Sequence, residues 1–270
     1  MSLLIVGTNG NFSTQFQNIA KNHISHSVNR NMYVNWDKKE SKLNKEIIQA
    51  KSAHNLRYIV NTVGVISKNH TNEFIMYWNY FFPKYLYQIS KELDLVLVTL
   101  GSIHENIPEM CVGNSYLESK IKLQQYLSKE SFENFCHFQF HTWYGGHKVQ
   151  PEMFLGQIIA SIKDKKEFKM SDGQQLREYH DITDDATCVL NFLNQGRVGI
   201  NSISHGERYS LSSIATSIFR YFQCEHLLKI NQIASPASEL REHVYFPSGI
   251  TEYEFRPTMK GIIDYVEKNI

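Results

Sequence analysis

Short runs of apolar residues alternate along the chain with longer segments in which apolar residues recur at helical spacing. Leu3 to Val6, Leu56 to Val60 and the run LDLVLVTL ending at Leu100 read as strands, whereas Leu43 and Ile47 lie on one face of a helix. The run ending at Leu100 is apolar throughout, which is typical of a strand buried on both faces of a parallel sheet. The pattern predicts an α/β fold.

A glycine turn, GTNGNFSTQF, links the first predicted strand to a helix. Glycines let the backbone approach a pyrophosphate closely, and a helix N-terminus supplies free N–H groups and a dipole that favours an anion. We therefore expect Gly7, Gly10, Asn11 and Phe12 to bind a dinucleotide. Ser13 stands where a third glycine often lies, and an ordinary strand-to-helix loop would look similar.

The second predicted strand, His26 to Arg30, ends without an acidic residue. A carboxylate there would bind a ribose 2′-hydroxyl, whereas Arg30 can pair with a 2′-phosphate. This favours NADP as the cofactor, with NAD as the alternative, although an ordinary exposed arginine would look the same. Asp37 can accept from an adenine amino group or cap the following helix, and the sequence alone favours the cap.

The third predicted strand runs into Asn61, Val63 and Gly64, which we expect beneath the ribose and phosphates of the cofactor. A long helical stretch follows, from about Asn72 to Leu93, with an expected kink at Pro83. Its aromatic residues are more numerous than one buried stripe needs. Part of this helix is therefore expected to pack against a second subunit, with packing into the core as the alternative.

Three side chains suited to proton transfer follow the strand that ends at Leu100. Ser102 is expected at the carboxyl end of that strand, where open α/β sheets bind ligands. Tyr116 and Lys120 are four residues apart in a helical segment and so share one face. A cation beside a phenol favours the phenolate, so we expect Lys120 to lower the pKa of Tyr116. A surface helix with a solvated lysine is the alternative.

Composition narrows the class of protein. The chain has 270 residues, 42% of them hydrophobic, and a formal charge of +1, which favours neither nucleic acid nor a membrane surface as a partner. Its four cysteines are scattered, which predicts neither a zinc site nor a disulfide framework and fits a cytoplasmic protein. The beginning, MSLLIVGTNG, resembles no signal peptide. His141 and His147 have no evident carboxylate or cysteine partner, so no metal site is expected.

The strand and glycine turn, the serine-ended strand and the segment YLESK together resemble the short-chain dehydrogenase/reductase superfamily. The second half, with FCHFQFHTWYGG and SDGQQLREYHDITDDA, is similar to its extended, nucleotide-sugar-modifying members, although Gly146 replaces their usual proline. Leu100 and Gly101 stand where serines often precede the catalytic serine of these enzymes.

The resemblance implies a Rossmann-type doubly wound parallel sheet with a small C-terminal substrate-binding subdomain. Residues 1–142, completed by 186–222, would form the NAD(P)-binding domain, and 143–185 and 223–270 the substrate-binding portion. Ser102, Tyr116 and Lys120 would be catalytic, and Tyr116 and Lys120 would also contact the cofactor. Arg177 would pair with the diphosphate of a nucleoside-diphosphate sugar, with His104 and Tyr144 beside it, and the enzyme would be a homodimer.

The activity expected is reduction of a keto sugar by NAD(P)H. Dehydratases of this branch carry an acidic pair beside the catalytic serine, whereas here Ile103 and His104 follow it and only Glu105 is acidic. An epimerase that retains its cofactor is the second interpretation. A non-catalytic dinucleotide-binding regulator on the same fold is the third, but it would not need all three residues of the triad. Asn79 lies in a helix that the family places beside the active site, and a purely structural amide explains it equally well.

Overall fold

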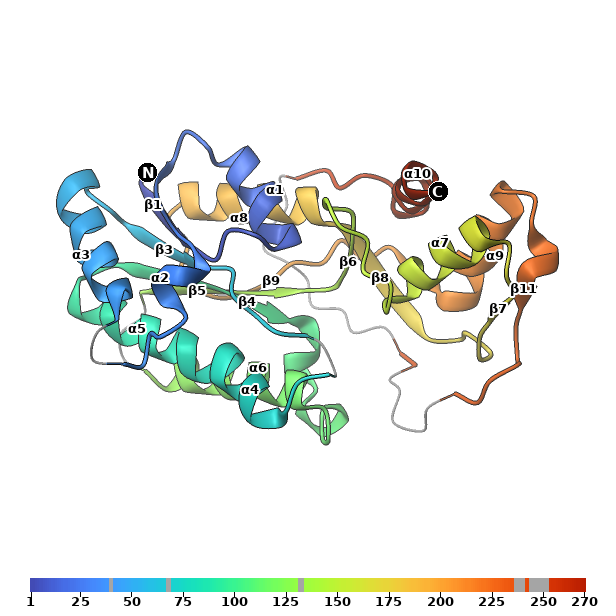
Figure 1. Ribbon diagram of the computed structural model, residues 1–270, viewed down its shortest axis with the longest axis horizontal. Coiled ribbons are helices and arrows are strands. Elements are labelled where there is room, and N and C mark those ends of the chain that lie inside the picture. The colour runs from blue at the N-terminus through green and yellow to red at the C-terminus, as the bar shows by residue number, and fades with distance from the viewer. Residues whose placement is uncertain (39–40, 67–68, 131–133, 236–240, 243–252) are drawn as a thin grey trace.

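A computed structural model describes residues 1–38, 41–66, 69–130, 134–235, 241–242 and 253–270. Its larger part is a six-stranded sheet whose strands are all parallel, as the alternating pattern predicted (Figure 1). The strands are β1 (Leu3–Val6), β2 (Ile24–Val28), β3 (Tyr58–Asn61), β4 (Val96–Ser102), β5 (Phe135–Phe140) and β9 (Gly199–Ser202). Their order across the sheet is β2-β1-β3-β4-β5-β9.

Alternate residues of the central strands enter two separate cores. In β1, Leu3 and Ile5 pack on one face of the sheet and Leu4 and Val6 on the other, and all four are fully buried. Burial on both faces requires helices on both sides, which explains the continuous apolar runs in the sequence.

Helices cover both faces of the sheet. One face is covered by α1 (Asn11–Ile19) and α8 (Ile182–Asn194), which pack against each other. The other face carries α2 (Arg30–Tyr33), α3 (Lys42–His54), α4 (Asn72–Met76), α5 (Phe82–Glu92) and α6 (Ser115–Lys129). Between β4 and α6 lie two short 3-10 turns, Ile103–Asn106 and Pro108–Met110. The predicted doubly wound Rossmann-type fold is therefore confirmed.

A smaller lobe with its own hydrophobic core lies beyond the carboxyl end of the sheet (Figure 1). Its elements are β6 (Thr142–Tyr144), α7 (Phe154–Asp164), β7 (Phe168–Lys169), β8 (Leu176–Asp181), β10 (Arg208–Ser210), α9 (Leu211–Tyr221), a 3-10 turn (Glu225–Leu227), β11 (Leu228–Lys229) and α10 (Thr258–Asn269). Strand β8 pairs parallel with β6 and antiparallel with β10.

The sequence assigned 186–222 to the cofactor-binding domain, and α9 departs from that assignment. Ile214 and Ile218 of α9 pack with Ile158 of α7 and Ile262 of α10 in the smaller core. Within the predicted segment, α8 and β9 belong to the larger part, and the chain passes into the smaller lobe after β9. Amphipathic helices look alike in sequence whichever core they cover.

The predicted helix from Asn72 to Leu93 is interrupted by a π-helical turn, Tyr77–Phe81, just before Pro83. Proline has no N–H to donate, and the ladder widens so that the N–H of Phe82 bonds the carbonyl of Tyr77. Most aromatic side chains here pack inward, while Phe81 is 48% exposed. No helix in the described part of the chain is long and apolar enough to cross a membrane.

Candidate active site

The order of strands reverses at β1, since β2 lies on one side of it and β3 on the other. A crevice opens at such a switch point, at the carboxyl ends of the strands. Gly7 follows β1 and Val63 follows β3, so the loops predicted to bind the cofactor meet there. A Cβ added at Gly7 would lie only 2.7 Å from Cγ2 of Val63.

The glycine turn is built differently at its two glycines. Gly7 has a φ of +89°, whereas Gly10 is the extended N-cap residue of α1 with a φ of −78°. The hydroxyls of Ser13 and Thr62 each donate to the carbonyl of Gly7 at 2.6 Å. Ser13, which stands where a third glycine often lies, therefore stabilises the turn through its side chain. No side chain caps α1, which leaves the amides of its first turn available for a phosphate.

Asn11 and Phe12 have structural roles besides the predicted one. The side chain of Asn11 donates to the carbonyl of Lys148 at 2.8 Å and accepts from its N–H at 3.1 Å. Gly146 lies against Asn11 with a φ of +85°, a value that proline cannot adopt, which explains the departure from the family pattern. Phe12 is buried and stacks on Trp143, so it can meet a cofactor mainly through its backbone.

At the end of β2, Arg30 is exposed and begins α2, which Asn29 caps through its side chain. The predicted second strand therefore ends two residues earlier, at Val28. The expectation that Asp37 caps the next helix is wrong, because Ser41 is the N-cap residue of α3. Asp37 is exposed and instead accepts a hydrogen bond from Tyr77, whose pKa burial and this contact raise to about 12.

The loop after β3 reaches the predicted triad. Asn61 accepts from the N–H of Val63 at 3.1 Å, and Asn79 bonds both the N–H and the carbonyl of Val65 at 2.8 Å. Asn79 is thus the structural amide that the sequence allowed. A Cβ added at Gly64 would lie 3.6 Å from Oδ1 of Asn79 and 3.9 Å from Nζ of Lys120.

Lys120 is a buried cation tied to the strand that carries Ser102. Its Nζ donates to the carbonyl of Leu100 at 2.6 Å, two residues before Ser102 at the end of β4. Asn114 caps α6, which places Tyr116 one turn before Lys120, with the lysine Nζ 5.7 Å from the centre of the phenol ring. The helix and the strand end thus bring the three predicted catalytic residues together.

Burial sets the proton affinities in this site. It raises the pKa of Tyr116 above its ordinary value and lowers the pKa of Lys120 to about 8. The expectation that Lys120 lowers the pKa of Tyr116 is therefore not met in this structure. Desolvation disfavours both charged forms, and the two residues are held as a neutral phenol and a cation that loses its proton near pH 8.

Two of the three predicted substrate residues lie near Ser102. Ser102 Oγ lies 3.2 Å from Nδ1 of His104, and burial together with the charge of Arg177 lowers the pKa of His104 to about 4. His104 is therefore neutral at pH 7 and can accept from the serine. Tyr144 lies elsewhere: it is 4% exposed, packs in the smaller core and approaches Gly261 of α10 closely.

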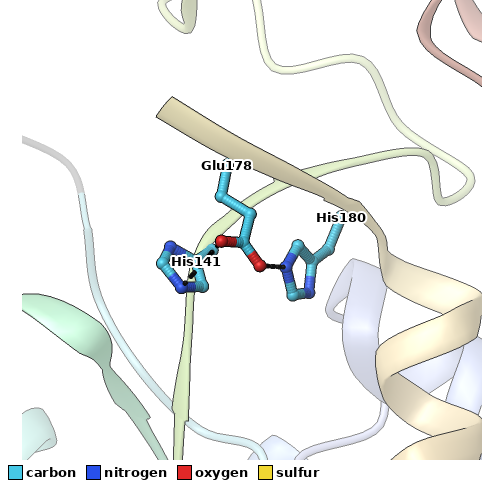
Figure 2. Close-up of side chains that lie close together, drawn as sticks. All are labelled: His141, Glu178 and His180. Atoms are coloured by element: carbon cyan, nitrogen blue, oxygen red, sulfur yellow. Dashed lines mark hydrogen bonds and ion pairs between the residues drawn. The ribbon is translucent and has the colours of Figure 1, made fainter. Parts of the chain in front are cut away.

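A buried ionic cluster at the junction of the two parts was missed in the sequence (Figure 2). Glu178 of β8 lies 2.9 Å from Nε2 of His180 and 3.6 Å from Nε2 of His141, and His180 Nδ1 lies 2.7 Å from Asp185. His141 therefore does have a carboxylate partner, contrary to expectation, because the pairing of β6 with β8 joins residues far apart in sequence.

Histidine and glutamate are common metal ligands, and His141, Glu178 and His180 lie close enough to share an ion. In this structure their charges are instead balanced by ion pairs within the cluster. His180 meets a carboxylate at each ring nitrogen, and carboxylates can only accept, so both nitrogens carry protons. Burial opposes that charge, but Asp185 and Glu178 outweigh it and raise the pKa of His180 to about 9. In this arrangement His180 forms an ion pair at each ring nitrogen, and the cluster as described is an ion network.

The parallel sheet, the phosphate-ready turn at its switch point and the assembled serine, tyrosine and lysine define a class of protein: dinucleotide-binding enzymes of the short-chain dehydrogenase/reductase type. The model of the NAD dependent epimerase/dehydratase family matches residues 43–209, more than half of the chain. The chain belongs to the NAD dependent epimerase/dehydratase family, as its motifs predicted.

Solved structures with this fold include three with informative descriptions. The Bordetella bronchiseptica enzyme WbmG in complex with NAD is 14% identical, with a TM-score of 0.76 over 99% of this chain and 94% of that one. A dTDP-4-dehydrorhamnose reductase from Bacillus anthracis in complex with NADP is 14% identical, with a TM-score of 0.75 over 99% of each chain.

The third is a UDP-N-acetylglucosamine 4-epimerase from Methanobrevibacter ruminantium in complex with UDP-N-acetylmuramic acid. It is 10% identical, with a TM-score of 0.76 over 98% of this chain and 97% of that one. At these identities the likeness establishes the fold, which reductases and epimerases share. No curated protein matches the chain in sequence.

Proposed function

We propose that the protein is an NADPH-dependent reductase that converts the keto group of a sugar linked to a nucleoside diphosphate into a hydroxyl group. The observation that carries the proposal is the bond from Lys120 Nζ to the carbonyl of Leu100, two residues before Ser102. It holds α6, and with it Tyr116, against the strand end that presents Ser102.

Each residue of the triad has a distinct role in the proposed reaction. The cofactor, when bound, supplies the hydride. Tyr116 gives its proton to the oxygen of the carbon that is reduced, and Ser102 hydrogen-bonds the same oxygen and keeps it near the phenol. Lys120 stabilises the phenolate that remains and holds the ribose hydroxyls of the cofactor. The crevice residues Gly7, Gly10, Asn61 and Gly64 would hold the dinucleotide.

The protonation of Tyr116 supports reduction as the direction. Burial raises its pKa, so the phenol keeps its proton at neutral pH and is ready to donate it. An oxidation would need the phenolate first. Dehydration is disfavoured as well, since the carboxylate of Glu105 is 1% exposed and bonded to the backbone of Ser102, out of reach as an acid or base on substrate.

The choice of cofactor and substrate rests on two arginines. Arg30 is exposed at the end of β2, where a guanidinium can pair with a 2′-phosphate, and a reductase of the same fold was solved with NADP. Arg177 interacts with His104 beside Ser102, where its forked guanidinium suits a diphosphate.

We also propose a homodimer through the face that exposes Phe81, to be tested by gel filtration with light scattering.

The stoichiometry of NADPH tests this function. The protein is incubated with NADPH and a panel of 4-keto sugars linked to nucleoside diphosphates, and loss of the reduced nicotinamide is compared with the amount of product. A reductase consumes one NADPH for each sugar converted. Conversion of a nucleotide sugar without net loss of NADPH would establish the epimerase instead, and binding without conversion of any sugar would favour the regulator.

A further inference from the structure

A carboxylate lies buried directly behind Ser102, in the turn that follows β4. Oε1 of Glu105 accepts from the N–H of Ser102 at 2.7 Å. Oε2 lies 2.7 Å from Nε2 of His137 and accepts from the side-chain amide of Gln139 at 3.1 Å. Glu105 is 1% exposed and His137 is fully buried. Neither side chain was expected to have a role from the sequence.

The contacts of this pair fix its position from both ends. Nδ1 of His137 lies 2.7 Å from the hydroxyl of Thr99 on β4, so the ring bridges β5 and β4. A Cβ added at Gly101 would lie 2.4 Å from Nε2 of His137 and 2.5 Å from Oε1 of Glu105. The pair therefore occupies the space of any side chain at position 101, which accounts for a glycine where related enzymes often have serine.

We infer that Glu105, held by His137, is a positioning residue for the Ser102, Tyr116 and Lys120 triad, fixing the serine backbone and placing its carboxylate behind the tyrosine and the lysine. As a role in catalysis this rests on the proposed function. Lys120 holds the carbonyl of Leu100 and Glu105 holds the N–H of Ser102, so the strand end that carries the serine is fixed on both sides.

Titratable groups face Glu105 from several neighbouring elements. Helix α6 contributes Tyr116 and Lys120, β5 contributes His137, and the turn itself contributes His104, which is neutral at pH 7 and has Arg177 of β8 beyond it. Cys111 also faces the carboxylate, and burial raises its pKa, so it stays uncharged. The negative charge of Glu105 opposes the effect of burial on Lys120 and adds to it on Tyr116.

The variant Glu105→Gln removes the charge and keeps the size of the side chain and a hydrogen-bonding oxygen for Ser102. Without the charge the proton affinities of Lys120 and Tyr116 both fall. We expect the titration midpoint of Lys120 to drop by about one pH unit, a tenfold change. NMR of the lysine Nζ resonances, with Lys120 assigned from a Lys120→Met sample, measures this without any substrate. The basic limb of kcat/KM should move in the same direction.

Glu178→Gln is the matched control, since Glu178 is an equally buried carboxylate that bonds a histidine and backbone N–H groups, but lies on β8 and is not among the groups that shift the pKa of Lys120 or Tyr116. It should leave the Lys120 midpoint in place. His137→Asn keeps the carboxylate of Glu105 but removes the imidazole that holds it. This variant should shift the titration midpoint of Lys120 in the same direction by less, and it decides the test if Glu105→Gln does not fold. An unchanged midpoint in the folded variants overturns the inference.

The two proposals can fail separately. A shifted midpoint in a protein that reduces no sugar would leave the positioning role of Glu105 standing and sink the proposed function. Turnover that depends on Tyr116, combined with an unshifted midpoint in Glu105→Gln, would do the reverse.

Discussion

At the scale of single residues, burial dominates the chemistry of the site. Tyr116 and Lys120 were expected to act on each other through charge, but desolvation is the larger influence on both and holds them as phenol and ammonium. His104 illustrates the same effect, because burial and Arg177 keep it neutral. In the proposed reaction, proton transfer would therefore involve Tyr116 and Lys120 and not the histidine beside the serine.

The pH dependence of kcat/KM follows from these values. We expect a basic limb near pH 8, where Lys120 loses its proton and can no longer stabilise a phenolate. Between pH 5 and 7 the profile should be flat, because the pKa of His104 lies near 4. Steady-state rates across this range check the prediction. An acidic limb near pH 6.5 would mean that a histidine titrates in the reaction.

Arg30 provides a second prediction for a single residue. Arg30→Ala should weaken the binding of NADPH by about tenfold, because the guanidinium no longer pairs with the 2′-phosphate, and should leave the binding of NADH unchanged. Fluorescence titration with each dinucleotide measures both constants. Equal losses for the two would contradict the role of Arg30, and an initial preference for NADH would give weight to the epimerase.

At the scale of elements, the turn between β1 and α1 shows two different needs for glycine. Gly7 needs its glycine for folding, since its φ is +89° and Val63 leaves no room for a Cβ. Gly10 has an ordinary backbone, and nothing described lies within 4 Å of a Cβ added there. The open space at Gly10 is compatible with the proposed phosphate site, where a ligand would approach the backbone closely.

Replacing each of these glycines by alanine separates folding from binding. Gly7→Ala should lower the free energy of unfolding by about 1–3 kcal/mol through the strained φ and the contact with Val63. Gly10→Ala should leave stability nearly unchanged, because the loss of a favoured N-cap residue opposes the smaller entropy of the unfolded chain, while weakening dinucleotide binding. Thermal unfolding and cofactor titration of both variants check this. Undiminished cofactor binding by Gly10→Ala would mean that the phosphates do not approach this turn.

At the scale of the whole molecule, ion networks join the smaller lobe to the sheet-bearing part. One is the cluster of His141, Glu178, His180 and Asp185 (Figure 2). In the other, Arg256 bonds Asp184 at 2.7 Å and 2.9 Å and Asp181 at 2.8 Å, which draws the segment before α10 onto the start of α8.

The cluster makes stability depend on pH. His180 has its pKa raised from 6.5 to about 9, so its contribution is complete below pH 6.5 and is lost as the pH rises through about 9. The pKa of Glu178 is lowered by the surrounding histidines against the effect of burial, so its contribution is lost only in acid. His180→Gln should cost about 3 kcal/mol at pH 6 and progressively less towards pH 9, measured by denaturant unfolding. A cost independent of pH would contradict the assignment.

The sequence predicted what local spacing and strand order determine. Tyr116 and Lys120 share a face because they are one helical turn apart, and Ser102 ends a strand that is recognisable by its apolar run. The Glu105–His137 pair was not predictable, because it joins residues 32 apart through the pairing of β4 with β5. The positions of Tyr144 and α9 were not predictable either. Both pack in the core of the smaller lobe, and no pattern in the sequence distinguishes residues of that core from residues of the larger part.

Tyr116→Phe tests the central claim most directly, because it removes one oxygen from the site and nothing else. Binding of NADPH and turnover of the nucleotide sugar are measured on the same preparations of wild type and variant. We predict an NADPH dissociation constant within about twofold of wild type and a loss of at least about 100-fold in kcat. A variant that turns over at the wild-type rate would show that Tyr116 is not the proton donor and that the proposed triad does not act in catalysis.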